Sequence, residues 1–269
     1  MIKKKLGFIG AGAMAEALIE GLLEKEIIAA DSLYISDINQ ARLDELTAKY
    51  GITQTADNSY LVTEVDYIIL AVKPQVIKKV LTEIGAKISR EQKVFSIAAG
   101  TELRQIEAEL NQVPTVRLMP NTAALIGEAA IAYSLGEYAG EETAAVVEEL
   151  FSAAGTITQV KEKLMDAVTG LSGSGPAYIY LIIEALSDAG VNMGLPREKS
   201  TELTLQTIIG AAKMVKESDL HPGELKDMVT SPGGTTIKGM QQLEEAGLRG
   251  VLYNTVEAAA NKSKELKEE

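Results

Sequence analysis

The sequence predicts an α/β protein in which a parallel sheet, wound with helices on both faces, is followed by an all-helical region. Up to about residue 160, strand-like apolar segments alternate with segments of helical periodicity. From about residue 161 the strand pattern stops, and only helical segments follow. The chain has 269 residues, which is enough to bury a substantial core. We therefore expect two domains, residues 1–160 and residues 161–269.

A glycine-rich turn directly follows the first expected strand, residues 6–9. The turn reads Gly10-Ala11-Gly12-Ala13-Met14-Ala15, fits the pattern G-x-G-x-x-A and leads into a helical segment. Gly10 permits the tight turn, Gly12 lets a pyrophosphate approach the backbone, and Ala15 lets the helix pack close to the sheet. The motif predicts a Rossmann-type dinucleotide site that binds NAD or NADP, although a tight turn alone would also explain it. The cofactor-binding residues expected here are Gly10, Ala11, Gly12, Ala13 and Met14.

Further segments continue the alternation of strands and helices. Strands are expected at residues 32–36, 65–72, 94–98, 115–118, 130–134 and 156–160, and helices at residues 40–50, 75–84, 102–110 and 141–153. Ligands of doubly wound sheets bind beyond the carboxyl ends of the strands. The residues that follow each strand are therefore the candidates for a binding site.

Asp37 follows the second expected strand. A carboxylate at this position can accept hydrogen bonds from the adenosine ribose hydroxyls, which favours NAD, whereas it repels a 2′-phosphate. The alternative is that Asp37 or Asn39 caps the helix that follows.

A lysine and a proline end the apolar strand at residues 65–72. In the sequence Ala71-Val72-Lys73-Pro74, the proline suits the first turn of a helix. Lys73 would place a cation at the mouth of the cleft, where it could serve the cofactor or a substrate carboxylate. A surface lysine with no role in binding is the alternative.

Small residues follow the next two strands. Ala98, Ala99 and Gly100 would allow a flat ring to approach closely, and Asn121 offers an amide. Loop structure alone would also explain both segments.

The second half of the chain contains an unusually apolar helix at residues 176–189. It is apolar nearly all round, so we expect it to be buried, partly in a second subunit. This predicts an all-helical dimerisation domain. Further helices are expected at residues 201–216, 224–229, 237–246 and 251–266.

Two Ser-Gly-Pro segments, residues 171–176 and 231–236, are expected to be loops that end at helix N-termini. Backbone N–H groups and hydroxyls there would suit a small carboxylate. The candidate substrate-binding residues are Ser172, Ser174, Ser231, Gly233, Gly234, Thr235 and Thr236. Common turns are the alternative explanation for either segment.

Composition excludes several classes of function. The net charge of −12 argues against a nucleic-acid partner, and no apolar run is long enough to cross a membrane. Residues 1–5 lead directly into the first strand, leaving no room for a signal peptide, and the lack of cysteine fits a cytoplasmic protein. No metal-ligand spacing occurs, and the single histidine, His221, is expected to serve a turn or a cap.

The candidate site is rich in N–H and hydroxyl donors and lacks a convincing general base. Such a site suits hydride delivery to a centre that is already electrophilic.

Along essentially its full length, the chain resembles the pyrroline-5-carboxylate reductases. The matching motifs are FIGAG (residues 8–12), AVKP (71–74), SIAAG (96–100), MPNT (119–122), VTGLSGSGPAY (168–178), LPR (195–197), HPGELKDM (221–228) and SPGGTTI (231–237). The resemblance implies reduction of the cyclic imine 1-pyrroline-5-carboxylate to L-proline by NADPH or NADH.

The resemblance also implies roles for individual residues. The nicotinamide would lie near residues 98–100 and 119–122, and the loop at 231–236 would hold the substrate carboxylate across a homodimer of interleaved helical domains. Thr236 would hydrogen-bond the ring nitrogen, and Asp219 matches a glutamate proposed as proton donor in some members. Asn58 matches an asparagine near the adenosine ribose or its phosphate. The homodimer could assemble further, into a decamer of dimers.

The chain departs from the family pattern at one position. Many members prefer NADPH and lack an acidic residue where this chain has Asp37. Ser36, Asn58 and Arg42 could nevertheless serve a 2′-phosphate, so both cofactors stay open.

Three other functions compete with this interpretation. A β-hydroxyacid dehydrogenase would carry a lysine on the first long helix of its second domain, and residues 178–189 contain none. The same donors would suit reduction of another cyclic imine. A non-catalytic dinucleotide sensor would need no substrate loops.

Overall fold

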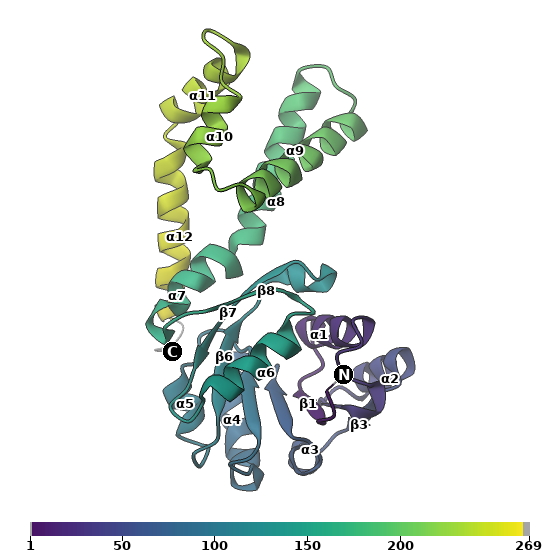
Figure 1. Cartoon of the computed structure of the whole chain (residues 1–269). Coiled ribbons are helices and arrows are strands. Elements are labelled where there is room, and N and C mark those ends of the chain that lie inside the picture. Colours follow the sequence, from purple (N-terminus) through teal and green to yellow (C-terminus); the bar gives the residue numbers. More distant parts are fainter. Residues whose placement is uncertain (1, 266–269) are drawn as a thin grey trace. The chain divides into compact units, whose positions relative to one another are not determined.

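The computed structural model describes residues 2–265, and within them eight strands form one sheet (Figure 1). The strands are β1 (Leu6–Ile9), β2 (Leu33–Ser36), β3 (Thr53–Thr55), β4 (Tyr67–Leu70), β5 (Lys93–Ser96), β6 (Thr115–Met119), β7 (Ala129–Leu135) and β8 (Gly155–Gln159). Their order across the sheet is β3-β2-β1-β4-β5-β6-β7-β8. The chain runs outward in both directions from β1, which places the glycine-rich turn at the switch point where such sheets bind ligands.

The expected parallel sheet is confirmed except at one pair, because β7 runs antiparallel to β6. A parallel crossover needs a dozen or more residues, whereas β6 and β7 are joined only through the short 3₁₀ helix η3 (Thr122–Ile126). Strand β3 and the helix after it were not predicted. β3 has three residues, all exposed or half-buried, so it lacks an apolar run.

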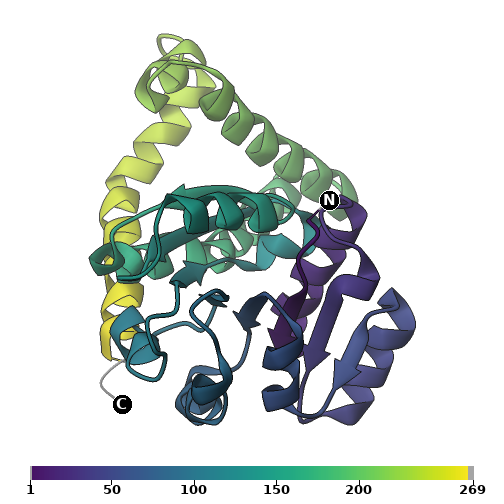
Figure 2. The same cartoon turned by 60° about the horizontal axis from the view of Figure 1, so that its bottom comes forward.

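Helices cover both faces of the sheet, as Figure 1 and Figure 2 show. They are α1 (Ala13–Glu24), α2 (Gln40–Tyr50), α3 (Asn58–Glu64), α4 (Pro74–Ile84), α5 (Leu103–Glu107) and α6 (Glu141–Phe151). Phe8 faces one core, made with α1, α2 and α6, while the next residue, Ile9, faces the other, made with α3, α4 and α5. The alternation of a pleated strand therefore builds two cores, and the doubly wound Rossmann-type fold is confirmed.

The rest of the chain is helical, as predicted. Its elements are the 3₁₀ helix η4 (Glu162–Leu164), α7 (Met165–Val168), the π-helical segment η5 (Thr169–Gly173), α8 (Gly175–Asn192), α9 (Arg197–Glu217), α10 (Pro222–Met228), α11 (Thr235–Glu245) and α12 (Leu248–Glu265). The predicted loop at residues 171–176 is wrong, since Ser172 and Gly173 belong to η5 and α8 begins at Gly175. The helix expected at residues 251–266 is found as α12, and residue 266 lies outside the described residues.

The chain forms two compact units. Within the described residues, the first comprises residues 2–174 together with residues 257–265, and the second is Gly175–Val256. These units differ from the predicted ranges 1–160 and 161–269, because residues 161–174 and the end of α12 pack with the sheet. A buried hydrogen bond of 2.9 Å, from the Ser263 hydroxyl to an Asp166 carboxylate oxygen, ties α12 to α7.

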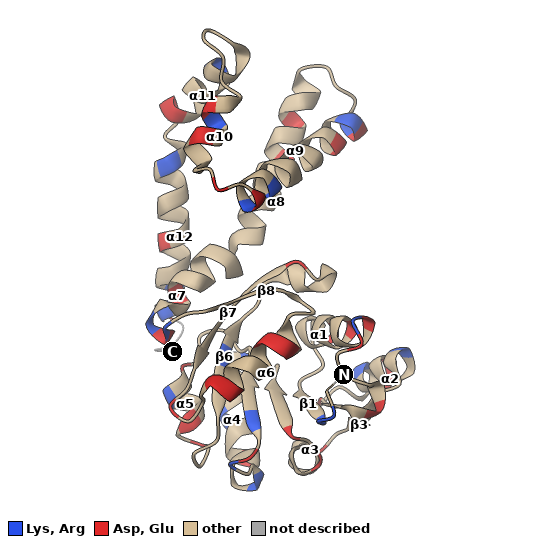
Figure 3. Ribbon diagram, in the orientation of Figure 1, with Lys and Arg blue, Asp and Glu red and all other residues tan. Residues whose placement is uncertain are grey.

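The second unit exposes many apolar side chains. Residues 175–183 of α8 and 203–212 of α9 carry no charge, and Figure 3 shows these uncharged stretches. Within one chain the expectation that the apolar helix is buried is wrong, because Tyr180 and Leu181 are 61% and 66% exposed. A surface of this kind marks an interface with a partner. No helix within residues 2–265 is both long and apolar enough to span a membrane.

Candidate functional site

The turn between β1 and α1 has room for a ligand at Gly12 and none at Gly10. Gly10 has a φ of 105°, and a Cβ there would lie 2.6 Å from the carbonyl oxygen of Ala71 at the end of β4. At Gly12, by contrast, a Cβ would have no described atom within 4 Å apart from those of Gly12 and its chain neighbours. Gly12 is the N-cap of α1, and no N-cap side chain accepts the first N–H groups of the helix. An anionic group such as a pyrophosphate would bind there.

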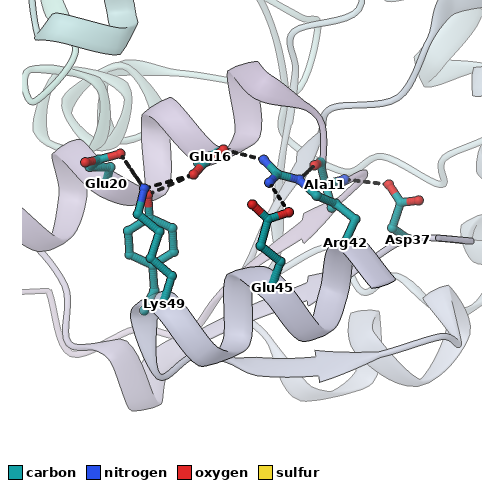
Figure 4. A network of polar contacts seen from close by, with 8 residues as sticks. Ala11, Glu16, Glu20, Asp37, Arg42, Glu45 and Lys49 are labelled. Atoms are coloured by element: carbon teal, nitrogen blue, oxygen red, sulfur yellow. Dashed lines mark hydrogen bonds and ion pairs between the residues drawn. The ribbon is translucent and has the colours of Figure 1, made fainter. Parts of the chain in front are cut away.

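The backbone N–H and carbonyl of Ala11 both form hydrogen bonds with side chains that follow β2 in the sequence, as Figure 4 shows. The Ala11 N–H donates to Asp37 Oδ2 at 2.7 Å, and Arg42 Nε donates to the Ala11 carbonyl oxygen at 3.0 Å. The other Asp37 oxygen accepts the N–H of Asn39 at 2.9 Å. The cap of α2 is the side chain of Asn39, so Asp37 contacts the glycine-rich turn and does not cap the helix.

Arg42 is the centre of an ionic network between α1 and α2. Its guanidinium pairs with Glu16 and, at 2.7 Å, with Glu45. Glu16 also receives Lys49 at 3.0 Å and the Tyr50 hydroxyl at 3.2 Å. These donors, Arg42 above all, lower the pKa of Glu16 to about 2. No sequence pattern predicts these roles of Glu16 and Glu45, because Arg42 reaches Glu16 only when α2 packs beside α1.

Ser36 and Asn58 form a hydrogen-bonded chain at the end of β2. The Ser36 hydroxyl is fully buried and donates to Asn58 Oδ1 at 2.7 Å. Asn58 Nδ2 in turn donates to Glu83 Oε2 at 3.3 Å. Because the hydroxyl has a single hydrogen, Ser36 supports Asn58 and is not itself positioned to donate to a ligand.

Asn121 joins the end of β6 to the π-helical segment. Its side chain accepts from the Ala123 N–H at 3.2 Å, and its Nδ2 donates to the carbonyl oxygen of Ser172 at 3.0 Å. The Ser172 hydroxyl donates to the Val168 carbonyl oxygen at 3.2 Å, and the Ser174 N–H donates within the same segment. A Cβ at Gly173 would lie 2.8 Å from Met119 Cε, so Gly173 packs closely against the end of the Met119 side chain. The structure therefore brings Asn121 and Ser172 together, as two candidate site residues should be.

A hollow of about 640 Å³ lies between α4 and α5, next to the end of β5. Three of the predicted cofactor residues, Pro74, Ala99 and Gly100, line it together with Lys78, Thr101 and Gln105. Pro74 begins α4, as predicted, and Lys73 is its N-cap. Ala71 and Val72 lie at the end of β4, where the Ala71 N–H donates to the Ile9 carbonyl oxygen at 2.8 Å.

In the second unit, the segment at residues 231–236 ends in an open helix N-terminus. Gly233 has a φ of 68°, and Gly234 is the N-cap of α11. A Cβ at Gly234 would lie 2.2 Å from Ser231 Oγ, so a side chain there would displace the Ser231 hydroxyl. Thr235 and Thr236 begin α11, whose first N–H groups lack a capping side chain at Gly234. The turn can therefore offer several donors to one small anion.

The remaining two candidates lie between α9 and α10. Asp219 is exposed in this connection. His221 Nδ1 accepts the Gly223 N–H at 3.0 Å and caps α10, which confirms the expected capping role.

Two family models match the chain. Residues 162–266 match "pyrroline-5-carboxylate reductase dimerisation", and residues 5–100 match "NADP oxidoreductase coenzyme F420-dependent". Among curated relatives, the pyrroline-5-carboxylate reductase of Methanosarcina acetivorans is 49% identical over 267 residues, covering 99% of both chains. That of Arabidopsis thaliana is 46% identical over 262 residues, covering 97% of this chain and 95% of the relative.

Solved structures agree with these relatives. The Plasmodium falciparum pyrroline carboxylate reductase with NADP bound is 37% identical, has a TM-score of 0.90 and covers 99% of both chains. A pyrroline-5-carboxylate reductase from Coxiella burnetii is 34% identical with a TM-score of 0.92, covering 98% of this chain and 99% of the other.

Proposed function

Because the chain belongs to the pyrroline-5-carboxylate reductase family, we propose that it reduces the C=N bond of 1-pyrroline-5-carboxylate to give L-proline. The observation that carries the proposal is the identity of up to 49% to curated members over nearly the whole chain. Both segments proposed to bind the substrate, residues 171–176 and 231–236, are present in this chain. A dinucleotide sensor without catalysis would need neither.

The first unit would hold NADPH or NADH along the carboxyl ends of its strands. The first N–H groups of α1, after Gly12, would bind the pyrophosphate, and Asp37 and Asn58 would lie at the adenosine end. Ala98, Ala99 and Gly100 would lie against the nicotinamide, with Asn121 nearby. The remaining proposed cofactor residues are Gly10, Ala11, Ala13, Met14, Ser36, Ala71, Val72, Lys73 and Pro74. When bound, the reduced cofactor supplies the hydride.

The segment at residues 231–236 would bind the substrate carboxylate. Its donors would be the hydroxyls of Ser231 and Thr235 and the backbone N–H groups at Gly233 and the start of α11. Gly234 would shape the segment, because its N–H donates to the Ser231 carbonyl oxygen at 3.1 Å. Thr236 would orient the ring nitrogen, while Ser172 and Ser174 would line the other side of the substrate. Fixing two rings at reacting distance can lower a barrier by roughly 7–11 kcal/mol, which is why no strong base is needed.

The proton balance of the reaction is simple. Hydride adds to the imine carbon, and the nitrogen keeps the proton that makes the imine electrophilic. The amine product gains its remaining proton from solvent or from Asp219, the proposed donor. The substrate segment would come from the partner subunit of a homodimer, which buries the apolar faces of α8 and α9. A decamer of dimers is a larger assembly that a measured molar mass would reveal.

A direct assay tests the function. Purified protein is mixed with 1-pyrroline-5-carboxylate and NADPH or NADH, and the loss of reduced-nicotinamide absorbance is followed. We expect oxidation with the five-membered imine, and Thr236→Ala should lower kcat by about tenfold or more through loss of one oriented hydrogen bond. Thr63→Ala, on the surface of α3, is the control and should keep full activity.

The assay also separates the alternatives. Turnover of a six-membered cyclic imine alone would show that the enzyme reduces that imine and not 1-pyrroline-5-carboxylate. Dinucleotide binding without turnover of any imine would favour the sensor.

A further inference from the structure

The adenosine end of the cofactor site decides between NADH and NADPH, which differ only by a phosphate on the 2′-oxygen of the adenosine ribose. In a Rossmann-type sheet this ribose lies at the end of the second strand. The groups that the structure places there are Asp37 directly after β2, Asn58 at the start of α3, and Arg42 on α2.

Asp37 is fixed as an acceptor. Both of its oxygens accept backbone N–H groups, from Ala11 at 2.7 Å and from Asn39 at 2.9 Å. Each of these carboxylate oxygens retains a lone pair that can accept a ribose hydroxyl. A 2′-phosphate at the same place would meet a negative charge that cannot turn away without releasing the glycine-rich turn.

Arg42 is the cationic residue nearest to Asp37 in the sequence, and its guanidinium is already paired with other groups. Its guanidinium pairs with Glu16 and Glu45 and donates to the Ala11 carbonyl oxygen, and its side chain is only 22% exposed. Turning toward a phosphate would break all three contacts. It would also separate the guanidinium from Glu16, a carboxylate whose low pKa keeps it charged at neutral pH.

The surroundings add further negative charge. Figure 4 shows Asp37, Glu16, Glu20 and Glu45 gathered around Arg42 and Lys49, so the carboxylates outnumber the cations. Lys49 is itself paired with Glu16 at 3.0 Å and Glu20 at 3.4 Å. The Asn58 amide also donates to a carboxylate, that of Glu83, at 3.3 Å.

We infer that Asp37 and the carboxylates that hold Arg42 make this enzyme prefer NADH to NADPH. The inference rests on the proposed function for the identity of the reaction, but it concerns only the affinity for the two dinucleotides. Asp37 would discriminate directly, by accepting the ribose hydroxyls. Glu16 and Glu45 would discriminate indirectly, by keeping Arg42 away from the 2′-position.

The test is a titration of the purified protein with NADH and with NADPH, followed by nicotinamide fluorescence, alongside kcat/KM for each. For the wild type we expect a Kd for NADPH at least about tenfold above that for NADH. Asp37→Ser should reduce this ratio by about tenfold or more, because the repelling charge is gone. Raising the salt concentration should also reduce the ratio in the wild type, because it screens the repulsion.

Two further variants keep the result interpretable. Glu45→Gln removes one partner of Arg42 without touching the glycine-rich turn, and should lower the ratio by about two- to fivefold. If Asp37→Ser does not fold, the Kd ratio measured for Glu45→Gln tests the inference. Asp31→Ser, at the opposite end of β2, is the matched control and should leave the ratio unchanged.

Two results would overturn the inference. One is a wild type that binds NADPH as tightly as NADH, and the other is a ratio that neither Asp37→Ser nor Glu45→Gln moves. Absence of imine reduction alongside a clear NADH preference in binding would reject the proposed function and leave the inference standing.

Discussion

Gly12 and Gly140 have the same local structure, so the pair isolates the role of the glycine-rich turn. Each is the N-cap of a helix in extended backbone, and at each a Cβ would have no described atom within 4 Å beyond the glycine and its chain neighbours. Gly12→Val should therefore fold, yet its side chain would occupy the space that we assign to the pyrophosphate. We expect the Kd of the reduced dinucleotide to rise by about a hundredfold or more, since helix N-terminal donors would be blocked.

Titration of both glycine variants checks this expectation. Gly140→Val, at the start of α6, carries the same cost of a β-branched N-cap and should leave the Kd unchanged. Equal binding by Gly12→Val and the wild type would show that the dinucleotide lies elsewhere.

The contribution of Glu16 to the free energy of unfolding should depend on pH. Arg42 and the other donors lower its pKa from 4.5 to about 2 in the folded chain. A lowered folded pKa means that the contribution is complete above the unfolded value near 4.5 and disappears as the pH falls toward 2. Because the group lies near the surface, we expect Glu16→Gln to cost about 1–2 kcal/mol at pH 7, less than the full shift implies.

Urea denaturation of the wild type and Glu16→Gln between pH 7 and pH 3 measures this difference. The gap in unfolding free energy should be constant down to about pH 5 and then shrink. Glu91→Gln, an exposed carboxyl elsewhere on the sheet unit, serves as the control. A gap that does not change with pH would mean that the ionic network adds nothing to stability.

At the scale of elements, helices and strands with a clear local sequence pattern were predicted correctly. Elements that depend on contacts with distant parts of the chain were not. Helix α2 has the predicted bounds, Gln40–Tyr50, because its apolar spacing and its N-cap Asn39 are both visible in the sequence. Strand β3 was missed because a short, partly exposed edge strand has no apolar run to reveal it. The segment η5 was missed because Ser and Gly usually indicate turns, whereas here the bond from Asn121 and the packing of Gly173 on Met119 accompany a π-helical turn.

The candidate site divides in the same way. The glycine-rich turn and the strand ends could be predicted, because each is a contiguous motif. The two hydrogen bonds that Asp37 and Arg42 make with the Ala11 backbone could not be predicted. These residues lie 26 and 31 positions from Ala11 in the sequence, and they reach it only in the folded chain. Ser36 was predicted from its position, but its burial behind Asn58 is a consequence of packing that no local pattern carries.

Helix α12 should owe part of its stability to the buried bond between Ser263 and Asp166. Both side chains are nearly fully buried, and the hydroxyl donates at 2.9 Å. Ser263→Ala removes the donor, so we expect a loss of about 1–3 kcal/mol in unfolding free energy, or a fall in Tm of several degrees. Calorimetry checks this, with Ser152→Ala, an exposed serine after α6, as the control. A loss no larger than that of the control would show that packing alone holds the end of α12.

At the scale of the whole molecule, the two units differ in what they leave exposed. The sheet unit encloses two well-filled cores, whereas the helical unit exposes apolar side chains along α8, α9 and α12. A chain that buries its sheet so completely but leaves long helices uncovered is built to associate through the helices. The match of residues 162–266 to a dimerisation family supports the same conclusion.

Tyr180 and Tyr138 allow this association to be tested with one type of substitution. Tyr180 lies on α8 in the helical unit and is 61% exposed, while Tyr138 lies in the sheet unit and is 42% exposed. Tyr180→Glu would bury a charge in the proposed interface, so we expect the dimer to dissociate at concentrations at least about tenfold higher than for the wild type. Reductase activity should fall with the dimer fraction, because each substrate segment is proposed to serve the partner subunit.

Light scattering across a dilution series, with activity measured on the same samples, gives both readouts. Tyr138→Glu introduces the same charge outside the helical unit and should keep both the molar mass and the rate of the wild type. If Tyr180→Glu stayed dimeric at wild-type concentrations, the subunits would have to meet through a different surface. If it became monomeric and stayed fully active, each subunit would hold a complete site, and the substrate segment would act within its own chain.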